Sequence, residues 1–172
     1  MQILVTGGTG YIGSHACVAL LAAGHNVTVV DDLSNSRVEV LDRVARIAGR
    51  RPAFFQGDVR DHSLLRSIFA ATPIDAVIHF AGLKAVGESV AQPLRYYDCN
   101  VGGAIALCQE MEAAAVKTLI FSSSATVYGD PAVVPIREDF PRSATNPYGA
   151  SKLIIEDILA DLVGADAGWR VA

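Results

Sequence analysis

The sequence is poor in the residues that mark disulfide-bonded and metal-binding proteins. It has only three cysteines, at Cys17, Cys99 and Cys108, with no spacing typical of a metal site. Their number is odd, and two of them fall within helical patterns, so we predict reduced thiols of the kind found in a cytoplasm. The four histidines show no ligand spacing either, and we therefore predict no bound metal.

The chain also lacks any long run of one charge or of apolar residues. Its 14 basic and 18 acidic residues are interspersed and give a net charge of −4, so no surface for nucleic acid is expected. No apolar stretch approaches the roughly 20 residues that cross a membrane. The first two residues lead directly into a short apolar run, without the pattern of a signal peptide. These absences predict a cytoplasmic protein with no nucleic-acid or membrane partner.

What the sequence does contain is a glycine-rich turn between two apolar patterns of different period. Residues 3–5 form an apolar run, which stops at Gly7, Gly10 and Gly13, and apolar residues then recur at helical spacing over residues 12–23. A glycine turn that opens a helix directs free N–H groups and the positive end of the helix dipole at one spot. This pattern predicts a pyrophosphate site, and a turn that needs glycine only for packing is the alternative.

The next apolar run supports the pyrophosphate interpretation. Residues 27–30 end at Asp31, eighteen residues after Gly13. An acidic residue at that distance is placed to accept hydrogen bonds from the adenosine ribose hydroxyls of NAD. Its charge would repel a ribose 2′-phosphate, so we predict NAD rather than NADP. Arg37 is close enough in sequence to weaken this preference, with an exposed loop arginine as the simpler interpretation.

Strand-like and helical patterns alternate along the whole chain. The expected strands cover residues 3–5, 27–30, 53–55, 75–80 and 118–121, with a sixth beginning at 169. Helical patterns end near 23, 47, 69, 115 and 162, while residues 83–92 are expected to be a loop. Alternation of this kind predicts a parallel sheet with right-handed crossovers. We predict an α/β fold with a Rossmann-type doubly wound parallel sheet, truncated at the start of its sixth strand, in one domain over residues 1–172.

Polar and glycine-rich groups follow the expected strands. In a parallel sheet of this kind, ligands bind beyond the carboxyl ends of the strands. The groups at these ends are Gly7, Asp31, Asp58, Ala81-Gly82 and Ser122-Ser123-Ser124. Five strand ends at one crevice indicate a binding site more strongly than any single motif. For Asp58 two interpretations stay open, a cap on the following helix and a contact with adenine.

Tyr148, Lys152 and Ser124 suggest a reaction. Tyr148 and Lys152 form a Y-x-x-x-K pattern and would share one helix face. A tyrosine ordinarily has a pKa near 10, so a tyrosine base near neutral pH needs about 4 kcal/mol of stabilisation. A lysine ammonium and a positive nicotinamide ring would supply much of it. Ser124 would hydrogen-bond the substrate oxygen. The alternatives are a chance spacing on a surface helix and a plain serine turn.

Longer motifs make the chain similar to a known family. Residues 7–15 read GGTGYIGSH, residues 79–89 read HFAGLKAVGES, residues 121–129 read FSSSATVYG and residues 148–152 read YGASK. These motifs resemble the extended short-chain dehydrogenase/reductases and, among them, the UDP-glucose 4-epimerases (UDP-galactose 4-epimerases), over nearly the whole chain. The first and last motifs belong to the superfamily, whereas the run over residues 79–89 is more specific to the epimerases.

The resemblance implies NAD as cofactor and a set of residues that hold it. Among these, Lys84 would reach cofactor or substrate oxygens, and Asp32 stands where the family usually has asparagine. The implied cofactor-binding residues are Gly7, Gly10, Tyr11, Ile12, Gly13, Asp31, Asp32, Leu33, Asn35, Ser36, Asp58, Val59, Phe80, Ala81, Gly82, Lys84, Ser122, Tyr148 and Lys152.

The resemblance also implies the reaction, an isomerisation of UDP-glucose and UDP-galactose at C4. Tyr148 would take the proton of the sugar 4-hydroxyl, with Ser124 and Lys152 as the other catalytic residues. NAD would take the C4 hydride, and the 4-keto sugar would turn over before the hydride returns. The substrate contacts would be Lys84, Ser124 and Tyr148. Related dehydratases carry an acidic pair where this chain has Ala125-Thr126, which disfavours loss of water.

Members of this family continue for about as many residues again. We therefore expect an NAD-binding Rossmann domain, incomplete at its C-terminus, without the smaller domain that holds the uridine diphosphate, and a truncated form that is inactive alone. Full-length members are expected to be homodimers. The alternative is a non-catalytic NAD-binding module or a fragment that needs a partner chain.

Overall fold

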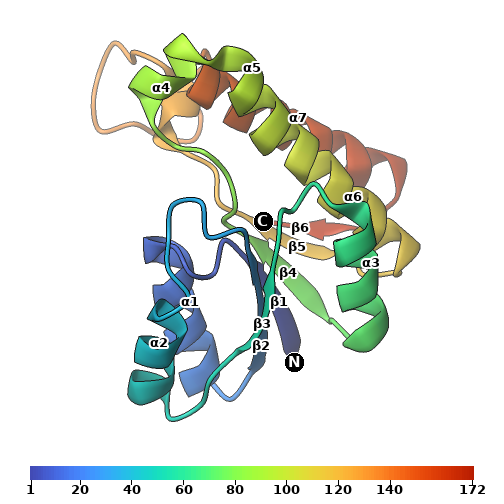
Figure 1. The fold of residues 1–172 in the computed structure, drawn as a ribbon. Helices are drawn as coiled ribbons and strands as arrows, with labels where there is room; N and C mark the ends of the chain where they lie inside the picture. The colour runs from blue at the N-terminus through green and yellow to red at the C-terminus, as the bar shows by residue number, and fades with distance from the viewer. The chain divides into compact units, whose positions relative to one another are not determined.

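A computed structural model describes residues 1–172 and contains one six-stranded parallel sheet (Figure 1). Its strands are β1 (Gln2–Thr6), β2 (Asn26–Asp31), β3 (Ala53–Gln56), β4 (Ala76–His79), β5 (Thr118–Phe121) and β6 (Arg170–Val171). They lie in the order β3-β2-β1-β4-β5-β6, and every neighbouring pair is parallel. The predicted Rossmann-type α/β fold is confirmed, and its sixth strand, β6, has two residues.

Helices connect the strands. They are α1 (Tyr11–Ala22), α2 (Val40–Ala48), α3 (His62–Ala71), α4 (Val86–Ala91), α5 (Pro93–Tyr96), α6 (Gly103–Ala113) and α7 (Pro147–Ala165). A π-helical segment (Tyr97–Gly102) joins α5 to α6, and a 3-10 turn (Ala125–Tyr128) follows β5.

The loop expected over residues 83–92 is wrong, because α4 lies there. The helix has only six residues and contains Gly87, so its sequence carries little helical signal. It is stabilised instead by a residue further along the chain. The Tyr96 hydroxyl accepts a hydrogen bond from Ala85 N (3.0 Å) and lies 2.8 Å from the Glu88 carboxylate. Tyr96 is fully buried, so a tertiary contact decides this helix.

The chain forms two compact units, which we describe separately. The sheet unit comprises Met1–Ala81, Ala106–Ser122 and Gly168–Ala172, and the helical unit comprises Gly82–Ile105 and Ser123–Ala167. The sheet unit contains all six strands with α1, α2 and α3. The helical unit contains α4, α5, the π-helical segment, the 3-10 turn and α7.

The central strands β1, β2 and β4 are buried on both faces of the sheet. On one face Val5 and Val29 pack in a cluster with Cys17 of α1 and Leu41 of α2. Successive strand residues point to opposite faces, so Leu4, which is fully buried, faces the other side. Figure 1 shows α1 and α2 on one side of the sheet and α3 on the other. Burial on both faces explains why the strands are almost continuously apolar.

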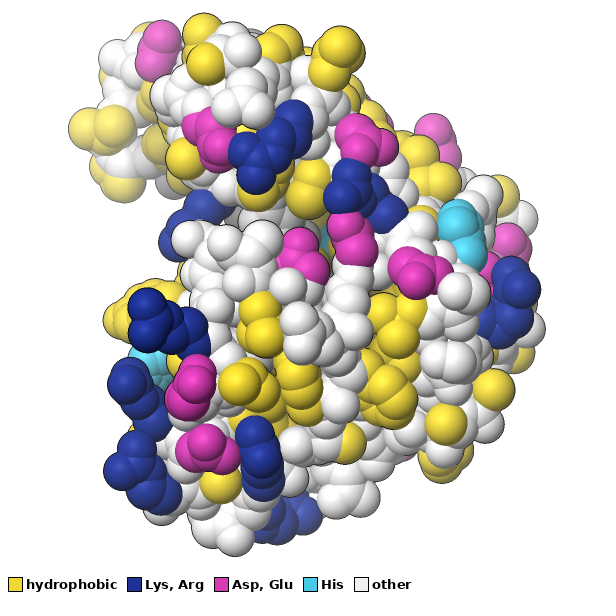
Figure 2. Space-filling model, in the orientation of Figure 1, with side chains coloured by type: hydrophobic (Ala, Val, Ile, Leu, Met, Phe, Trp, Pro, Cys, Tyr) yellow, Lys and Arg dark blue, Asp and Glu magenta, His cyan; other side chains and the backbone are white.

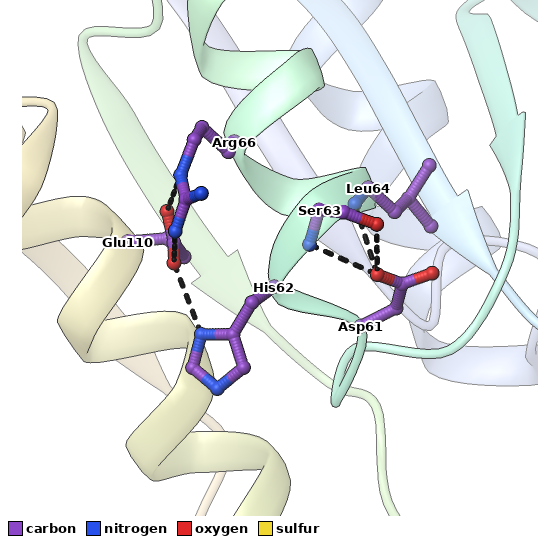
Figure 3. Close-up of polar contacts among 6 residues, drawn as sticks. All are labelled: Asp61, His62, Ser63, Leu64, Arg66 and Glu110. Carbon is purple, nitrogen blue, oxygen red and sulfur yellow. Dashed lines mark hydrogen bonds and ion pairs between the residues drawn. The ribbon is translucent and has the colours of Figure 1, made fainter.

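Helix α3 begins at Asp61 and not at Asp58. The Asp61 carboxylate accepts hydrogen bonds from Ser63 N (2.9 Å) and Leu64 N (3.1 Å), as Figure 3 shows. Asp58 instead accepts from the backbone N (2.8 Å) and the guanidinium of Arg60, which lowers the pKa of the Asp58 carboxyl. The interpretation of Asp58 as the helix cap is therefore wrong.

A charged cluster joins α3 to the end of α6 within the sheet unit (Figure 3). The Glu110 carboxylate accepts from Arg66 Nε (3.1 Å) and Nη2 (2.9 Å) and from His62 Nδ1 (3.0 Å). Hydrogen bonds from Arg66 and His62 hold the pKa of Glu110 below its usual value. The side chain of Glu110 is only 6% exposed, so these partners compensate the burial of its charge.

Three further observations concern the surface charge, the length of the helices and the cysteines. Acidic and basic side chains lie interspersed on the face drawn in Figure 2. No helix combines the length and the apolar character that crossing a membrane requires. None of the three cysteines is in a disulfide, and burial raises the pKa of Cys17 to about 12 and that of Cys108 to about 11.

Candidate functional site

The glycine turn of the sheet unit is shaped by backbone contacts. Gly7 has φ +68°, and a Cβ there would lie 2.7 Å from Ala81 N. A Cβ on Gly13 would lie 2.2 Å from Gly7 O, so the start of α1 passes directly over the turn. No side chain caps α1, and its first turn holds no acidic residue. The turn therefore leaves amide donors at the positive end of a helix, which suits a phosphate group.

Asp31 is held at the end of β2 by three donors. Its Oδ1 accepts from Leu33 N (3.0 Å) and Ser36 Oγ (3.1 Å), and its Oδ2 accepts from Thr9 N (3.1 Å). Thr9 Oγ1 also lies 2.6 Å from Ser36 Oγ, so the glycine turn and the loop after β2 are bonded to each other. A carboxylate has about four acceptor positions. One position therefore remains on Oδ2, which suits a single hydroxyl donor.

The same turn and loop enclose a hollow of about 480 Å³ in the sheet unit. It brings together four of the predicted cofactor residues, Gly10, Tyr11, Asn35 and Ser36. The hollow is also lined by residues that the sequence analysis did not assign to the site, namely Thr9, Glu39, Val40 and Arg43. Arg37, an exposed loop arginine, lines it too.

Hydrogen bonds also join the carboxyl ends of the neighbouring strands. The Thr6 hydroxyl lies 2.7 Å from His79 Nδ1 and accepts from Ala81 N (3.2 Å), while Ser122 N donates to His79 O (3.2 Å). Thr6 and His79 are both buried. The predicted residues Ala81 and Ser122 thus lie at one edge of the sheet, where β4 and β5 end.

In the helical unit, Asn146 begins the helix that carries Tyr148 and Lys152. Its side chain accepts from Gly149 N (2.9 Å), and Pro147 fills the first helical position. Tyr148 and Lys152 are one turn apart on α7. Lys152 is 6% exposed, and this burial lowers its pKa from 10.5 to about 8.

The geometry of Ser124 determines what its hydroxyl can do. Ser124 Oγ accepts from Thr126 N (3.2 Å) and from Thr126 Oγ1 (2.9 Å). A serine hydroxyl has two acceptor positions and one hydrogen. Both acceptor positions are occupied, so the Ser124 hydrogen is left for donation. Thr126 was not predicted, although a threonine two residues after a serine is a known turn and capping pattern.

The segment that carries Lys84 is held by Asn100, another residue that the sequence analysis missed. Asn100 Oδ1 accepts from Leu83 N (2.7 Å), and its Nδ2 donates to Leu83 O (3.0 Å) and to Ser151 Oγ (2.9 Å). A Cβ on Gly82 would lie 3.0 Å from Asn100 Oδ1. Lys84 itself is exposed. No group of histidine, cysteine and acidic residues in the chain is arranged to hold a metal.

A parallel sheet with this glycine turn, a carboxylate after its second strand and a Tyr–Lys helix is the architecture of the dinucleotide-binding short-chain dehydrogenase/reductase class. The chain belongs to the NAD dependent epimerase/dehydratase family, whose model matches residues 3–172.

Its curated relatives include UDP-glucose 4-epimerases. The chain is 57% identical to UDP-glucose 4-epimerase of Neisseria meningitidis serogroup B over 171 residues, covering 99% of this chain and 50% of that protein. It is 58% identical to the Bacillus subtilis enzyme of the same name, covering 100% and 51%. The predicted resemblance is confirmed. The chain spans about half the length of the curated relatives it matches.

Solved structures of UDP-glucose 4-epimerases have the same fold as this chain. The crystal structure of UDP-glucose 4-epimerase from Bifidobacterium longum in complex with NAD+ and UDP matches with a TM-score of 0.98 and 49% identity, covering 99% of this chain and 51% of that one. The enzyme from Stenotrophomonas maltophila, with bound NAD and formylated UDP-arabinopyranose, matches with a TM-score of 0.97 and 48% identity, again covering 99% and 51%. The roles of the individual site residues stay predictions.

Proposed function

We propose that this chain carries the NAD-binding and proton-transfer residues of a UDP-glucose 4-epimerase, an isomerase that interconverts UDP-glucose and UDP-galactose. The observation that carries the proposal is an unbroken set of groups for this reaction in a chain more than half identical to curated epimerases. The set comprises the glycine turn, Asp31, Lys84, Ser124, Tyr148 and Lys152.

The sheet unit has the features that an NAD site needs. The uncapped start of α1 would donate backbone hydrogen bonds to the pyrophosphate, and the tight approach at Gly13 keeps side chains away from it. The one free acceptor position of Asp31 would take a ribose hydroxyl. Its negative charge opposes a 2′-phosphate, which supports NAD over NADP.

The helical unit has the groups for moving the proton. Tyr148 would take the proton of the sugar 4-hydroxyl, and the Ser124 hydroxyl would donate a hydrogen bond to the same sugar oxygen. Thr126 fills the acceptor positions of Ser124 and so supports donation by Ser124, which leaves Tyr148 as the base. With a pKa of about 8, Lys152 is mostly an ammonium at pH 7 and would stabilise the tyrosinate. NAD, when bound, accepts the hydride from C4 and returns it.

Two further features belong to the proposal. A homodimer, as expected of full-length members of the family, is supported by apolar side chains on the helices of the helical unit, of which Leu94 is 82%, Ile154 39% and Val163 40% exposed. A cytoplasmic location is supported by three cysteines that form no disulfide. Light scattering of the purified chain tests the first, and a monomer at micromolar concentration would contradict it.

Calorimetric titration of the chain with NAD and NADP, followed by a turnover assay with UDP-galactose, tests the proposed function. We expect NAD to bind at least tenfold more tightly than NADP, and Asp31→Asn to narrow that ratio. Tyr148→Phe should bind NAD with unchanged affinity but show no turnover. Binding by the native chain without turnover would mean a competent NAD-binding part of an epimerase that does not catalyse the reaction alone. No binding at all would refute the proposal.

A further inference from the structure

Glu156 lies in the helical unit on α7, one turn beyond Lys152 and two turns beyond Tyr148. One of its carboxylate oxygens accepts a short hydrogen bond from Ser123 Oγ. The other accepts from Arg142 Nη1 at 2.9 Å. The side chain of Glu156 is 25% exposed, and both oxygens have a partner. Neither the sequence patterns nor the resemblance assigns this residue to the site.

Ser123 directly precedes Ser124, so the bond from Glu156 acts on the segment that carries the predicted hydrogen-bond donor. The two bonds of Ser124 both come from Thr126, two residues further on. They set the direction of the Ser124 hydroxyl but do not connect it to α7. The contact between Ser123 and Glu156 makes that connection.

A second contact holds the other end of the same segment. A Cβ on Gly149 would lie 2.8 Å from Thr126 O, so α7 packs against the backbone of the 3-10 turn directly after Tyr148. The segment from Ser123 to Thr126 is therefore attached to α7 at two points. One point is a close backbone contact, and the other is the carboxylate of Glu156.

Arg142 holds this carboxylate in place. It donates to Glu156 Oε2 through one terminal nitrogen and to Asp157 Oδ1 (2.9 Å) through the other. Asp157 is 57% exposed, and its hydrogen bond comes from Arg142 and not from Ser123. The chain thus provides two neighbouring carboxylates on one helix that share an arginine, of which only Glu156 holds the serine segment.

We propose that Glu156 is a positioning residue of the proton-transfer site, which anchors Ser123 to α7 and so holds Ser124 in place relative to the helix of Tyr148 and Lys152. The catalytic part of this inference rests on the proposed function, whereas the anchor itself does not. Ser124 has one hydrogen to donate, and that hydrogen is useful only if its segment keeps a constant position.

Amide hydrogen exchange of the 172-residue chain tests the anchor without cofactor or substrate. Glu156→Ala should speed exchange of the amides of residues 123–128 at least tenfold, because a charge-assisted hydrogen bond is lost. Glu156→Gln keeps an oxygen that accepts from Ser123 and should stay within threefold of the native chain. Asp157→Asn is the matched control and should leave these amides unchanged. Equal exchange in Glu156→Ala and Asp157→Asn would overturn the anchor.

Turnover of UDP-galactose tests whether the anchor serves the reaction. We expect kcat to fall about tenfold in Glu156→Ala with KM within twofold, and Glu156→Gln to restore most of it. A KM effect without a kcat effect, or unchanged turnover despite faster exchange, would overturn the positioning role. A native chain that binds NAD without turnover is the result expected of a truncated form, and the exchange experiment alone would then support or overturn the anchor. Failure of the proposed function is recognised separately, by the absence of NAD binding.

Discussion

Lys152 gives the sharpest prediction, because its burial has a consequence that can be measured without substrate. Its side chain is almost entirely removed from water, which lowers its pKa from 10.5 to about 8. Below pH 8 the folded protein carries a buried ammonium. In the unfolded chain the same ammonium is hydrated, so its charge opposes folding.

The sign and size follow from proton linkage. Between pH 8 and 10.5 the unfolded chain binds more protons at this lysine than the folded chain, so the free energy of unfolding rises with pH. Each tenfold step in a protonation equilibrium is worth about 1.4 kcal/mol, and the lowered pKa therefore corresponds to about 3 kcal/mol. Lys152→Met, of similar length but uncharged, should be more stable than the native chain by up to about this amount at pH 7. The advantage should vanish near pH 10.5.

Urea unfolding followed by circular dichroism at several values between pH 7 and 10.5 measures this difference. The buried thiols Cys17 and Cys108 titrate equally in both chains, so their contribution cancels. Lys117→Met, at a half-buried lysine next to β5, is the control for replacing a lysine by methionine elsewhere in the chain. A stability difference that is independent of pH, or a Lys152→Met chain less stable at pH 7, would refute the reasoning.

Three further predictions concern the turn, a cap and the serine. Gly13→Ala places a Cβ 2.2 Å from a backbone oxygen of the glycine turn and should weaken NAD binding at least a hundredfold by calorimetry; unchanged affinity would exclude the turn as the pyrophosphate site. Asp61→Ala should lower the Tm by about 2–4 °C because α3 loses its cap. Asp58→Ala should lower it less, and the reverse order would contradict the assignment of the cap. Thr126→Val should lower kcat about tenfold, because it releases an acceptor position of Ser124, and Thr126→Ser should restore kcat. An unchanged kcat in Thr126→Val would argue against Ser124 as a hydrogen-bond donor to the substrate.

Much of the fold could be predicted because its signals are local. A strand buried on both faces must be apolar throughout, and a helix between layers must repeat its apolar residues every three or four positions, so each element is visible in its own residues. The failures lie where local signals are weak or ambiguous. Asp58 and Asp61 are both acidic residues ahead of the same helix. Only the three-dimensional structure shows that the Asp61 carboxylate accepts from the free amides at the start of α3. Helix α4 is short, and its stability comes from Tyr96.

The residues of the candidate site also divide into those that the sequence predicts and those that only the structure shows. The glycine turn, Asp31 and the Tyr148–Lys152 pair follow from residue type and spacing, because phosphate binding and proton transfer need particular groups at particular positions along the chain. The residues that hold these groups in place could not be predicted. Glu156 reaches Ser123 across 33 residues of sequence, and no pattern along the chain signals that contact.

The sequence by itself determined the order of strands and helices, the glycine turn and the identity of the groups available for chemistry. Only the tertiary structure decided how these groups are buried, charged and hydrogen-bonded. Lysine is usually exposed, and the packing around α7 buries Lys152 and lowers its pKa. Serine can donate or accept, and the two bonds from Thr126 fill the acceptor positions of Ser124 and leave its hydrogen for donation. Burial and hydrogen-bond direction arise from neighbours in space, which a linear pattern does not contain.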